Sequence, residues 1–445
     1  MHKLFFLKTK KLNQNKVQLI TLGCSKNWVD SENLMTQLSH NQIDVEHNPN
    51  SKTSNTVIIN TCGFIDRAKE ESINTILEYA NLKSQGIVEK LYVTGCLSQR
   101  YKSNLEEEIP EVDAFFGTME MPALLATLNA DYKQELVGER IISTPSHYAY
   151  LKISEGCNRT CSFCAIPLMR GKHVSVPLEQ LIKQASYLAS MGVKELILIA
   201  QELTYYGLDI YKKRSLHTLL GALSNVNGIE WIRLHYAYPS KFPLEILDVI
   251  KSESKICNYL DIPLQHFSDP VLKNMKRQIS QEETRALVQN IRDKIPEIHL
   301  RTTMLVGFPG ETENDFNTLC KFIEETKFER LGVFQYSHEE DTSAYKLDDN
   351  IPPEIKEERA LALMQIQEQI SFESNQQKIG KTFKTLIDKK ENACYIGRTE
   401  FDSPEVDNEV IIKSDATNYI RVGDFINATI FQADAFDLHA NVSTL

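Results

Sequence analysis

Three cysteines stand within eight residues in the stretch "SEGCNRTCSFCAIPLMRGKH", at Cys157, Cys161 and Cys164. A C-x3-C-x2-C spacing on a loop lets three thiolates converge on one small metal centre. Zinc needs a closed tetrahedron, so a zinc site would take a fourth ligand such as His173. A 4Fe-4S cluster normally takes four cysteines, and with three it keeps one iron open for a substrate. Both metals accept thiolates, and the missing fourth cysteine favours the cluster.

A second trio of cysteines is spread along the N-terminal region. The runs "KVQLITLGC", "NTVIINTCG" and "KLYVTGC" are apolar and end in a cysteine beside a glycine, at Cys24, Cys62 and Cys96. Ordinary buried cysteines are the alternative, since free Cys is among the most buried residue types. Glycine permits a tight backbone, and the carboxyl ends of parallel strands gather ligands. The sequence therefore predicts a second cluster site.

Alternating strands and helices must position both trios. The N-terminal strands are separated by helical stretches such as "DSENLMTQLSH", which indicates a parallel α/β sheet. Six further strand-like runs begin near Tyr148 and cover about 190 residues, fewer than the ~250 of an eight-fold barrel. They predict a partial (βα)6 barrel. Short β-rich runs near the C-terminus predict a small all-β barrel. We expect a tail (1–15), a cysteine domain (16–143), a barrel domain (144–375) and the β-barrel (376–445).

Composition limits the function classes. The 445 residues are 42% hydrophobic and 24% charged, and the longest apolar runs fall well short of a membrane span. The N-terminal apolar run is too short for a signal peptide, so we expect a cytoplasmic protein with no membrane partner. The chain has nine cysteines, and in a cytosolic protein such residues serve more often as ligands or catalysts than in disulfides. A net charge of −11 makes a nucleic acid a less favoured principal partner.

The cysteine loop, at the end of the first strand of the predicted barrel, resembles the signature of the radical S-adenosylmethionine enzymes. Phe163 occupies the usual aromatic position. The resemblance implies that the open iron binds the amino and carboxylate groups of S-adenosylmethionine. A one-electron transfer then cleaves it to methionine and a 5′-deoxyadenosyl radical. Strand ends where the cofactor should lie offer five candidate contacts: Gln201, Glu202, Arg233, Gly307 and Gly310.

From about Lys16 to the C-terminus the motifs resemble the methylthiotransferases. Among them are "LITLGCSKNWVDSE", "INTCGFI", "VTGCLSQRY", "RTTMLVGFPGET" and "GRTEFDSPEVDNEV". The family combines an N-terminal cluster domain, a radical domain and a C-terminal TRAM barrel. Two positions depart from its pattern: Glu202 stands where Asp is usual, and Asp341 where glycine is usual.

Two branches of that family differ in substrate. The stretches "SEGCNRTCSFCAIPLMRGKHVS" and "TYYGLDIY" resemble the branch that acts on a ribosomal protein. The alternative is the branch that modifies tRNA at the adenosine beside the anticodon. From Lys378 to Leu445 there are 8 Lys and Arg against 11 Asp and Glu. An acidic barrel suits a basic ribosomal protein, whereas tRNA phosphates call for a positive one.

The resemblance also implies a reaction. The β-carbon of one aspartate in the twelfth protein of the small ribosomal subunit, free or in the assembled subunit, receives a methylthio group. Two 4Fe-4S clusters serve, one held by each trio. One S-adenosylmethionine methylates a sulfur on the N-terminal cluster, and another yields the radical at the central cluster. We expect a monomer that takes electrons from a donor such as flavodoxin or ferredoxin. A zinc-bound adaptor without catalysis is the rival from another class. The remaining cysteines, Cys257, Cys320 and Cys394, match no motif and are taken as structural.

Overall fold

The computed structural model describes residues 16–50, 54–136, 138–413 and 419–443. The chain divides into two compact units, Met1–Ser143 and Thr144–Leu445. The tail 1–15, which the sequence predicts to be frayed, lies outside the described residues. Within the described ranges, none of the helices combines the length and the apolarity that crossing a membrane requires.

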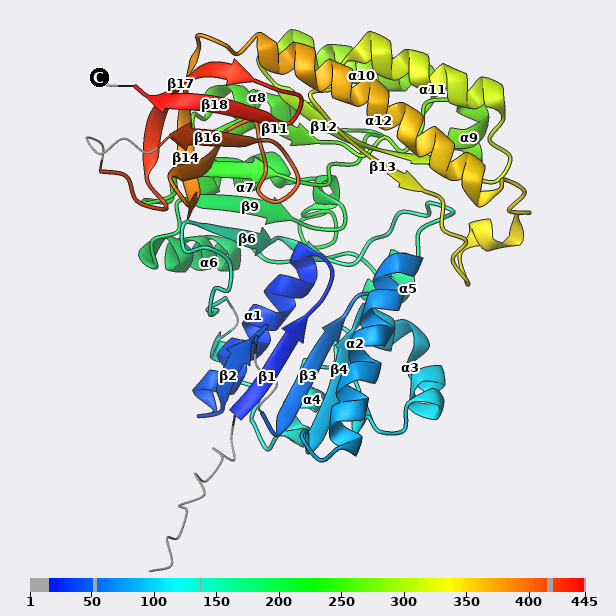
Figure 1. Cartoon of the computed structure of the whole chain (residues 1–445), viewed down its shortest axis with the longest axis vertical. Coiled ribbons are helices and arrows are strands. Elements are labelled where there is room, and N and C mark those ends of the chain that lie inside the picture. The colour runs from blue at the N-terminus through cyan, green and yellow to red at the C-terminus, as the bar shows by residue number, and fades with distance from the viewer. Residues whose placement is uncertain (1–15, 51–53, 137, 414–418, 444–445) are drawn as a thin grey trace, which may run out of the picture. The chain divides into compact units, whose positions relative to one another are not determined.

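The first unit is a parallel sheet with helices on both faces (Figure 1). Its strand order is β2-β1-β3-β4-β5. The strands are β1 (Lys16–Thr21), β2 (Asp44–His47), β3 (Thr56–Thr61), β4 (Lys90–Gly95) and β5 (Ala114–Phe115). The helices are α1 (Ser25–His40), α2 (Asp66–Ser84), α3 (Cys96–Glu108) and α4 (Met121–Thr127). The three strands predicted to end in cysteine are confirmed as β1, β3 and β4, which are neighbours in the sheet.

Alternate residues of β3 enter two separate cores. Val57 and Ile59 pack with residues of α2 and α3, among them Ile76. Ile58 packs on the opposite face with Leu38 of α1. Because both faces are covered, the strand is a continuous apolar run rather than an alternating one. The edge strand β2 escaped prediction since its sequence, DVEH, is polar, and β5 escaped it since it has two residues.

The second unit contains a six-stranded parallel sheet in the order β13-β12-β11-β10-β9-β6. Its strands are β6 (Tyr148–Lys152), β9 (Glu195–Ile199), β10 (Trp231–Leu234), β11 (Ile256–Asp261), β12 (His299–Val306) and β13 (Arg330–Gln335). The order follows the chain and leaves β6 and β13 as the two edges, so the barrel is open. The prediction of a partial barrel of six βα units is confirmed, strand by strand. A short pair, β7 (Ser154–Glu155) and β8 (Val174–Ser175), frames the cysteine loop.

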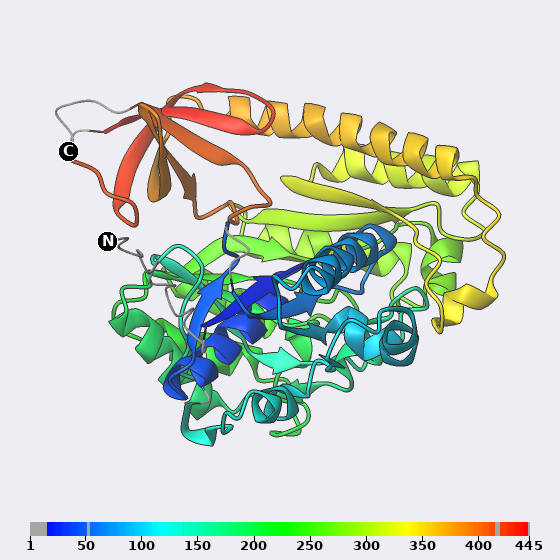
Figure 2. The ribbon, with the colours of Figure 1, turned by 60° about the horizontal axis from the view of Figure 1, so that its bottom comes forward.

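Helices link these strands, and two of them begin with capping boxes at Ser280 and Thr312. They are α5 (Ile166–Arg170), α6 (Leu178–Ser190), α7 (Leu216–Ser224), α8 (Glu245–Ser252), α9 (Asp269–Asn274), α10 (Gln281–Lys294), α11 (Glu313–Thr326) and α12 (Pro353–Gln376). In Figure 2, α12 runs beside α11 and leads into the C-terminal strands.

The C-terminal strands close into a barrel in the order β14-β15-β16-β18-β17. They are β14 (Thr382–Glu391), β15 (Cys394–Thr399), β16 (Glu409–Lys413), β17 (Phe425–Ala433) and β18 (Asp437–Val442). The predicted all-β barrel is confirmed, although β18 was missed because DLHANV is half polar. This barrel shares a hydrophobic cluster with the sheet, in which Trp231 and Cys257 pack with Leu386 and Phe425.

Candidate functional site

The central cysteines lie on the loop that follows β7 and precedes α5. All three thiols are partly buried. Gly156, with φ +73°, opens the loop, and a Cβ there would lie 2.1 Å from the carbonyl oxygen of Lys172. Only glycine fits such a close approach in the left-handed region. The Cys157 N–H donates to the carbonyl of Gly171 at 3.1 Å, which ties the start of the loop to the end of α5.

The three central thiols act on one another electrostatically. Burial raises the pKa of Cys157 to about 11, and the nearby Cys161 contributes in the same direction. Burial likewise raises the pKa of Cys164 to about 12, with further contributions from Cys161 and Cys157. The three thiols therefore lie near enough on the loop to influence one another, and their joint binding of one cluster stays a prediction.

The chemistry of these donors fits an iron–sulfur cluster better than zinc. His173, the suggested fourth zinc ligand, instead hydrogen-bonds the Ser175 hydroxyl at 3.0 Å. In the part of the chain that the structure describes, no three His, Cys, Asp or Glu side chains form a ready ligand set for one metal ion. A 4Fe-4S cluster distributes its thiolates over separate irons, so three converging cysteines suit it without His173.

Sequence reasoning missed Arg159, which lies inside the cysteine loop and anchors it. Its guanidinium donates to Glu202 Oε2 from Nε at 3.2 Å and from Nη2 at 3.0 Å. The same guanidinium stacks on the rings of Tyr205 at 4.0 Å and Tyr238 at 3.8 Å. Tyr206, by contrast, is fully buried.

Glu202 was predicted to contact the cofactor, and the structure shows partners for it within the protein. Its side chain is 1% exposed, and Oε1 accepts the Thr204 N–H at 2.6 Å while Oε2 accepts from Arg159. With both oxygens engaged and buried, Glu202 supports the cysteine loop, and a contact with the cofactor stays a prediction. The signal for this role lies in Arg159, a cation between two cysteines that requires a buried anion.

Gln201 lies beside Glu155, at the start of the same loop. Its Nε2 donates to Glu155 Oε1 at 2.8 Å. Burial alone would raise the pKa of Glu155, but Lys152 and Arg170 hold it at about 2. Gln201 Oε1 is buried and, among the described residues, meets no hydrogen-bond donor. An orphaned acceptor beside a fixed carboxylate fits a ligand that brings a positively charged amino group.

Gly307 and Gly310 both have a positive φ, a backbone conformation that favours glycine. Gly307 has φ +73°, and a Cβ there would lie 2.3 Å from Cγ of Lys356 on α12. Gly310 has φ +84° with open space around it. Glu311, which the sequence reading passed over, accepts the N–H groups of Gly307 at 2.6 Å and Phe308 at 3.1 Å. Cofactor contacts by either glycine stay a prediction. Asp341, the other departure, has φ 61°, a conformation that Asp tolerates better than most residues.

Arg233, the remaining predicted cofactor contact, has partners within the protein. The side chain is fully buried, and Nε donates to Glu195 Oε1 at 2.8 Å. Nη1 and Nη2 donate to the carbonyl oxygens of Glu400 and Thr399 at 2.6 and 3.4 Å. Each nitrogen therefore has an acceptor, and Nη1 and Nη2 join the sheet to the C-terminal barrel.

The N-terminal cysteines follow three adjacent parallel strands of the first unit. Cys24 is the N-cap of α1, Cys62 follows β3, and Cys96 begins α3 directly after β4. A Cβ on Gly23 would lie 2.6 Å from Cys62 Cβ, and one on Gly63 would lie 3.0 Å from the Cys96 carbonyl carbon. The glycines thus allow the three strand ends to meet, as the sequence predicts.

Asn27, which the sequence reading did not single out, ties these ends together. Its Nδ2 donates to the carbonyls of Leu22 at 2.8 Å and Thr61 at 3.0 Å. Its Oδ1 lies 3.8 Å from Cys96 Sγ. An asparagine placed three residues after the first cysteine of the trio was the available signal.

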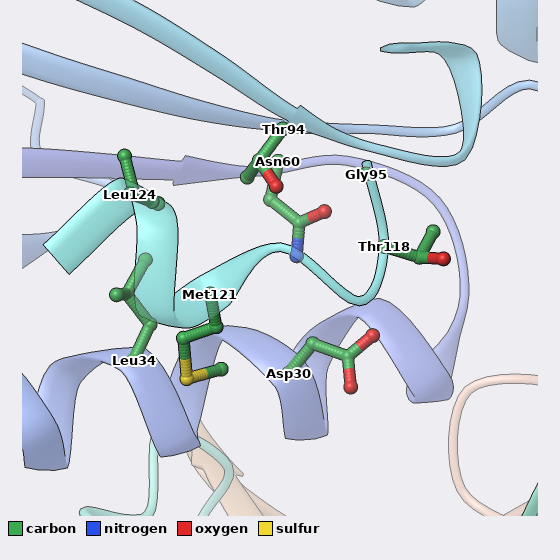
Figure 3. A pocket seen from close by; sticks show the side chains of 8 residues that line it. All are labelled: Asp30, Leu34, Asn60, Thr94, Gly95, Thr118, Met121 and Leu124. Carbon is green, nitrogen blue, oxygen red and sulfur yellow. The ribbon is translucent and has the colours of Figure 1, made fainter. Parts of the chain in front are cut away.

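A small cavity of the first unit lies between α1, the ends of β3 and β4, and the start of α4 (Figure 3). Asp30, Asn60, Thr94 and Thr118 supply its polar lining. Its volume of about 30 Å³ has room for a water molecule and not for S-adenosylmethionine. The residues that line it include none of the three cysteines, so the cavity is not part of their site.

Three family models match the chain, each over one part. Residues 16–117 match uncharacterized protein family UPF0004, residues 151–323 the radical SAM superfamily, and residues 379–442 the TRAM domain. Among solved structures, the radical S-adenosylmethionine methyltransferase TsrM from Kitasatospora setae aligns with a TM-score of 0.54 and 15% identity. That alignment covers 72% of this chain and 75% of TsrM, and it shows the fold alone.

Similarity to two known proteins extends over nearly the whole chain. The ribosomal protein uS12 methylthiotransferase RimO of Cytophaga hutchinsonii is 60% identical over 98% of this chain and 100% of its own length. That of Flavobacterium psychrophilum is 58% identical over 97% of this chain and 99% of its own length. With both cysteine trios in place, this identity shows that the chain belongs to the RimO family of radical S-adenosylmethionine methylthiotransferases.

Proposed function

We propose that this chain attaches a methylthio group to the β-carbon of one aspartate of ribosomal protein uS12. The observation that carries the proposal is the presence of two three-cysteine sites in a chain of the RimO family, each at the carboxyl ends of parallel strands. One site forms the radical, and the other presents the sulfur to be inserted.

The radical site would be held by Cys157, Cys161 and Cys164. When bound there, a 4Fe-4S cluster supplies the single electron that cleaves S-adenosylmethionine into methionine and the radical that removes a β-hydrogen. Arg159 and Glu202 fix the loop on which the cysteines stand. The rings of Tyr205 and Tyr238 pack on Arg159 and hold it in place on the half-buried loop.

Gln201 is our candidate contact for the amino group of S-adenosylmethionine. Its buried Oε1 has no donor among the described residues. Ser154 Oγ is likewise buried without a hydrogen-bond partner among them. Glu155 holds Gln201 through Nε2, so the free acceptor is oriented before a ligand arrives. Gly307 and Gly310 remain candidates for the adenosyl end. Glu202 and Arg233 are weaker candidates for cofactor contacts, because they already hydrogen-bond to other groups of the protein.

The second site would be formed by Cys24, Cys62 and Cys96. These residues would hold the second 4Fe-4S cluster, which when bound supplies the place for a sulfur methylated by another S-adenosylmethionine. Gly23 and Gly63 keep the three strand ends close, and Asn27 holds the backbone around them.

The charge of the C-terminal barrel gives the substrate choice less support than its sequence suggested. Asp402 and Asp407, two of its acids, are buried in ion pairs with Arg330 and Arg301 of the sheet. Asp388, a third, pairs with Arg398 at 2.8 Å. These carboxylates are not a free acidic surface for a basic protein. The preference for uS12 over tRNA therefore rests on the family.

The family implies further partners, which we include in the proposal. Radical formation requires a one-electron donor of the flavodoxin or ferredoxin kind. Ribosomal substrates place the enzyme in the cytoplasm, and we propose that it acts as a monomer.

Mass spectrometry of uS12 and of tRNA, from cells with and without the gene, tests the proposal. We expect uS12 to lose the mass of one methylthio group in the deletion strain, with tRNA unchanged. Restoring the gene should restore the modification. Loss of methylthio-adenosine from tRNA instead would leave the radical chemistry in place and replace the substrate. If neither molecule changes, the methylthiotransferase proposal fails.

A further inference from the structure

Arg277 contacts the central cysteine loop from a distant part of the chain. It follows α9, and its Nη1 donates to Cys161 Sγ at 3.3 Å. Its Nη2 donates to the carbonyl of Pro263, and the side chain is 3% exposed. The Ser162 N–H donates to the carbonyl of Met275 at 3.0 Å, which fixes the turn against the loop. A buried guanidinium is thus held on the sulfur of one cysteine.

The two arginines beside this loop differ in how their charge is balanced. Arg159 has Glu202 at 3.0 Å. Among the ion pairs of the described residues, Arg277 has no carboxylate partner, and its Nε is buried without an acceptor. A buried cation without an anion is costly. The anion next to Arg277 is the thiolate that Cys161 becomes when it binds iron.

Tyr238 holds Arg277 in this position. Its hydroxyl donates to the Arg277 carbonyl at 2.9 Å, and its ring lies 4.2 Å from the Arg277 guanidinium. The hydroxyl oxygen is also 3.5 Å from Cys161 Sγ, but its single hydrogen is engaged by the carbonyl. Arg277 is therefore the side-chain donor to the sulfur, and Tyr238 sets its place.

We propose that Arg277 is a positioning residue that raises the reduction potential of the cluster held by Cys157, Cys161 and Cys164. The inference rests on the cluster assignment made under the proposed function. Reduction adds one negative charge to a centre that its thiolates already make negative. A permanent cation at 3.3 Å from a ligand sulfur stabilises that added charge. Hydrogen bonds to cysteine sulfurs are known to set the potentials of such clusters.

Redox titration followed by electron paramagnetic resonance tests the proposal. The full-length chain carries Cys24→Ala, Cys62→Ala and Cys96→Ala, so that only the central cluster titrates. In this background we expect Arg277→Gln to lower the reduced-to-oxidised ratio at fixed potential roughly tenfold, which is about 59 mV for one electron.

Lys276→Gln is the matched control for this titration. Lys276 is the adjacent cation, but it is exposed and donates to the Ser343 hydroxyl at 3.0 Å. Its removal should leave the midpoint unchanged. An Arg277→Gln cluster that titrates with the parent midpoint would overturn the proposal.

A second measurement covers the case in which Arg277→Gln binds no cluster. The unsubstituted enzyme is labelled with ¹⁵N in the arginine guanidinium only. The backbone nitrogen stays unlabelled because the backbone N–H of Arg159 donates to Cys157 Sγ at 3.4 Å and would give a coupling of its own. Electron–nuclear double resonance of the reduced cluster should then show a weakly coupled ¹⁵N, which Arg277→Lys removes. Absence of that coupling overturns the proposal whatever the variants do. A parent chain without any cluster signal would instead contradict the proposed function.

Discussion

The two cysteine sites are built in opposite ways. The central trio occupies one loop of eight residues, and side chains from elsewhere hold that loop: Glu202, Tyr238 and Arg277. The N-terminal trio takes one cysteine from each of three neighbouring strand ends, and glycines let the backbones approach. A site whose ligands are close in sequence thus depends on distant side chains. A site whose ligands are distant in sequence depends on local backbone shape.

This difference has consequences for what each site tolerates. Changes of charge around the loop should damage the central site and spare the N-terminal one. Changes of backbone shape at the strand ends should do the reverse. Activity, iron content and stability can each be measured for the two sites separately.

The largest expected effect separates the two trios by reaction. Cys161→Ala should abolish both 5′-deoxyadenosine formation and methylthio transfer, because the radical site loses a ligand. Cys62→Ala should abolish methylthio transfer while 5′-deoxyadenosine still forms. Chromatography of the nucleoside and mass spectrometry of uS12 measure the two products in the same reaction. Equal loss of 5′-deoxyadenosine in both variants would show that radical formation is not confined to the central site.

Glu202→Ala should break the central site without touching a cysteine. Arg159 would be left as a buried cation without its anion, which costs about 3–5 kcal/mol. We expect the iron content to fall from about eight to about four per chain, since the N-terminal cluster is independent of this pair. Glu202→Asp keeps the carboxylate and should retain part of the lost iron. A Glu202→Ala chain with full iron would show that cluster binding does not depend on the Arg159–Glu202 ion pair.

Gly95→Ala is the corresponding change at the N-terminal site. Gly95 has φ +101°, and a Cβ would lie 2.5 Å from both Asn60 Oδ1 and the carbonyl oxygen of Thr61. Backbone strain and overpacking together should cost about 2–5 kcal/mol. Iron should be lost from the N-terminal site alone. Thermal unfolding would measure the loss of stability, and iron analysis would measure the loss of iron.

Gly86→Ala provides the matched control for the strand-end glycine. Gly86 also has a positive φ, +74°, but nothing lies within 4 Å of an added Cβ. Its replacement should cost about 1–2 kcal/mol of backbone strain and leave iron unchanged. If both alanine variants lost iron equally, close approach at Gly95 would not be what the site requires.

The same contrast explains how far the sequence could be interpreted. Apolar runs located every strand of the open barrel, and cysteine spacing located the central loop, because both signals are local. Equivalent strand ends located the N-terminal trio, because parallel neighbours end at one edge. Strand β2 could not be found this way, since an edge strand of four polar-rich residues carries no apolar pattern.

Side-chain partners were the part that local patterns could not supply. Arg277 lies 116 positions after Cys161, and Glu202 lies 43 after Arg159. Such pairs form only once the sheet has placed its loops together. For the same reason Arg233 was assigned to the cofactor: its position on a strand was clear, but its partners in the C-terminal barrel were not.

The smallest expected effect concerns a cysteine outside both trios. Cys320 lies on α11, half-buried, and burial raises its pKa to about 11. A single cysteine on a helix has neither the loop nor the converging strand ends that gather ligands. Cys320→Ala should therefore keep about eight irons per chain and change the unfolding free energy by about 1 kcal/mol or less. Loss of iron in this variant would mean that a lone cysteine can ligate a cluster here. The distinction between gathered and isolated cysteines would then no longer identify the sites.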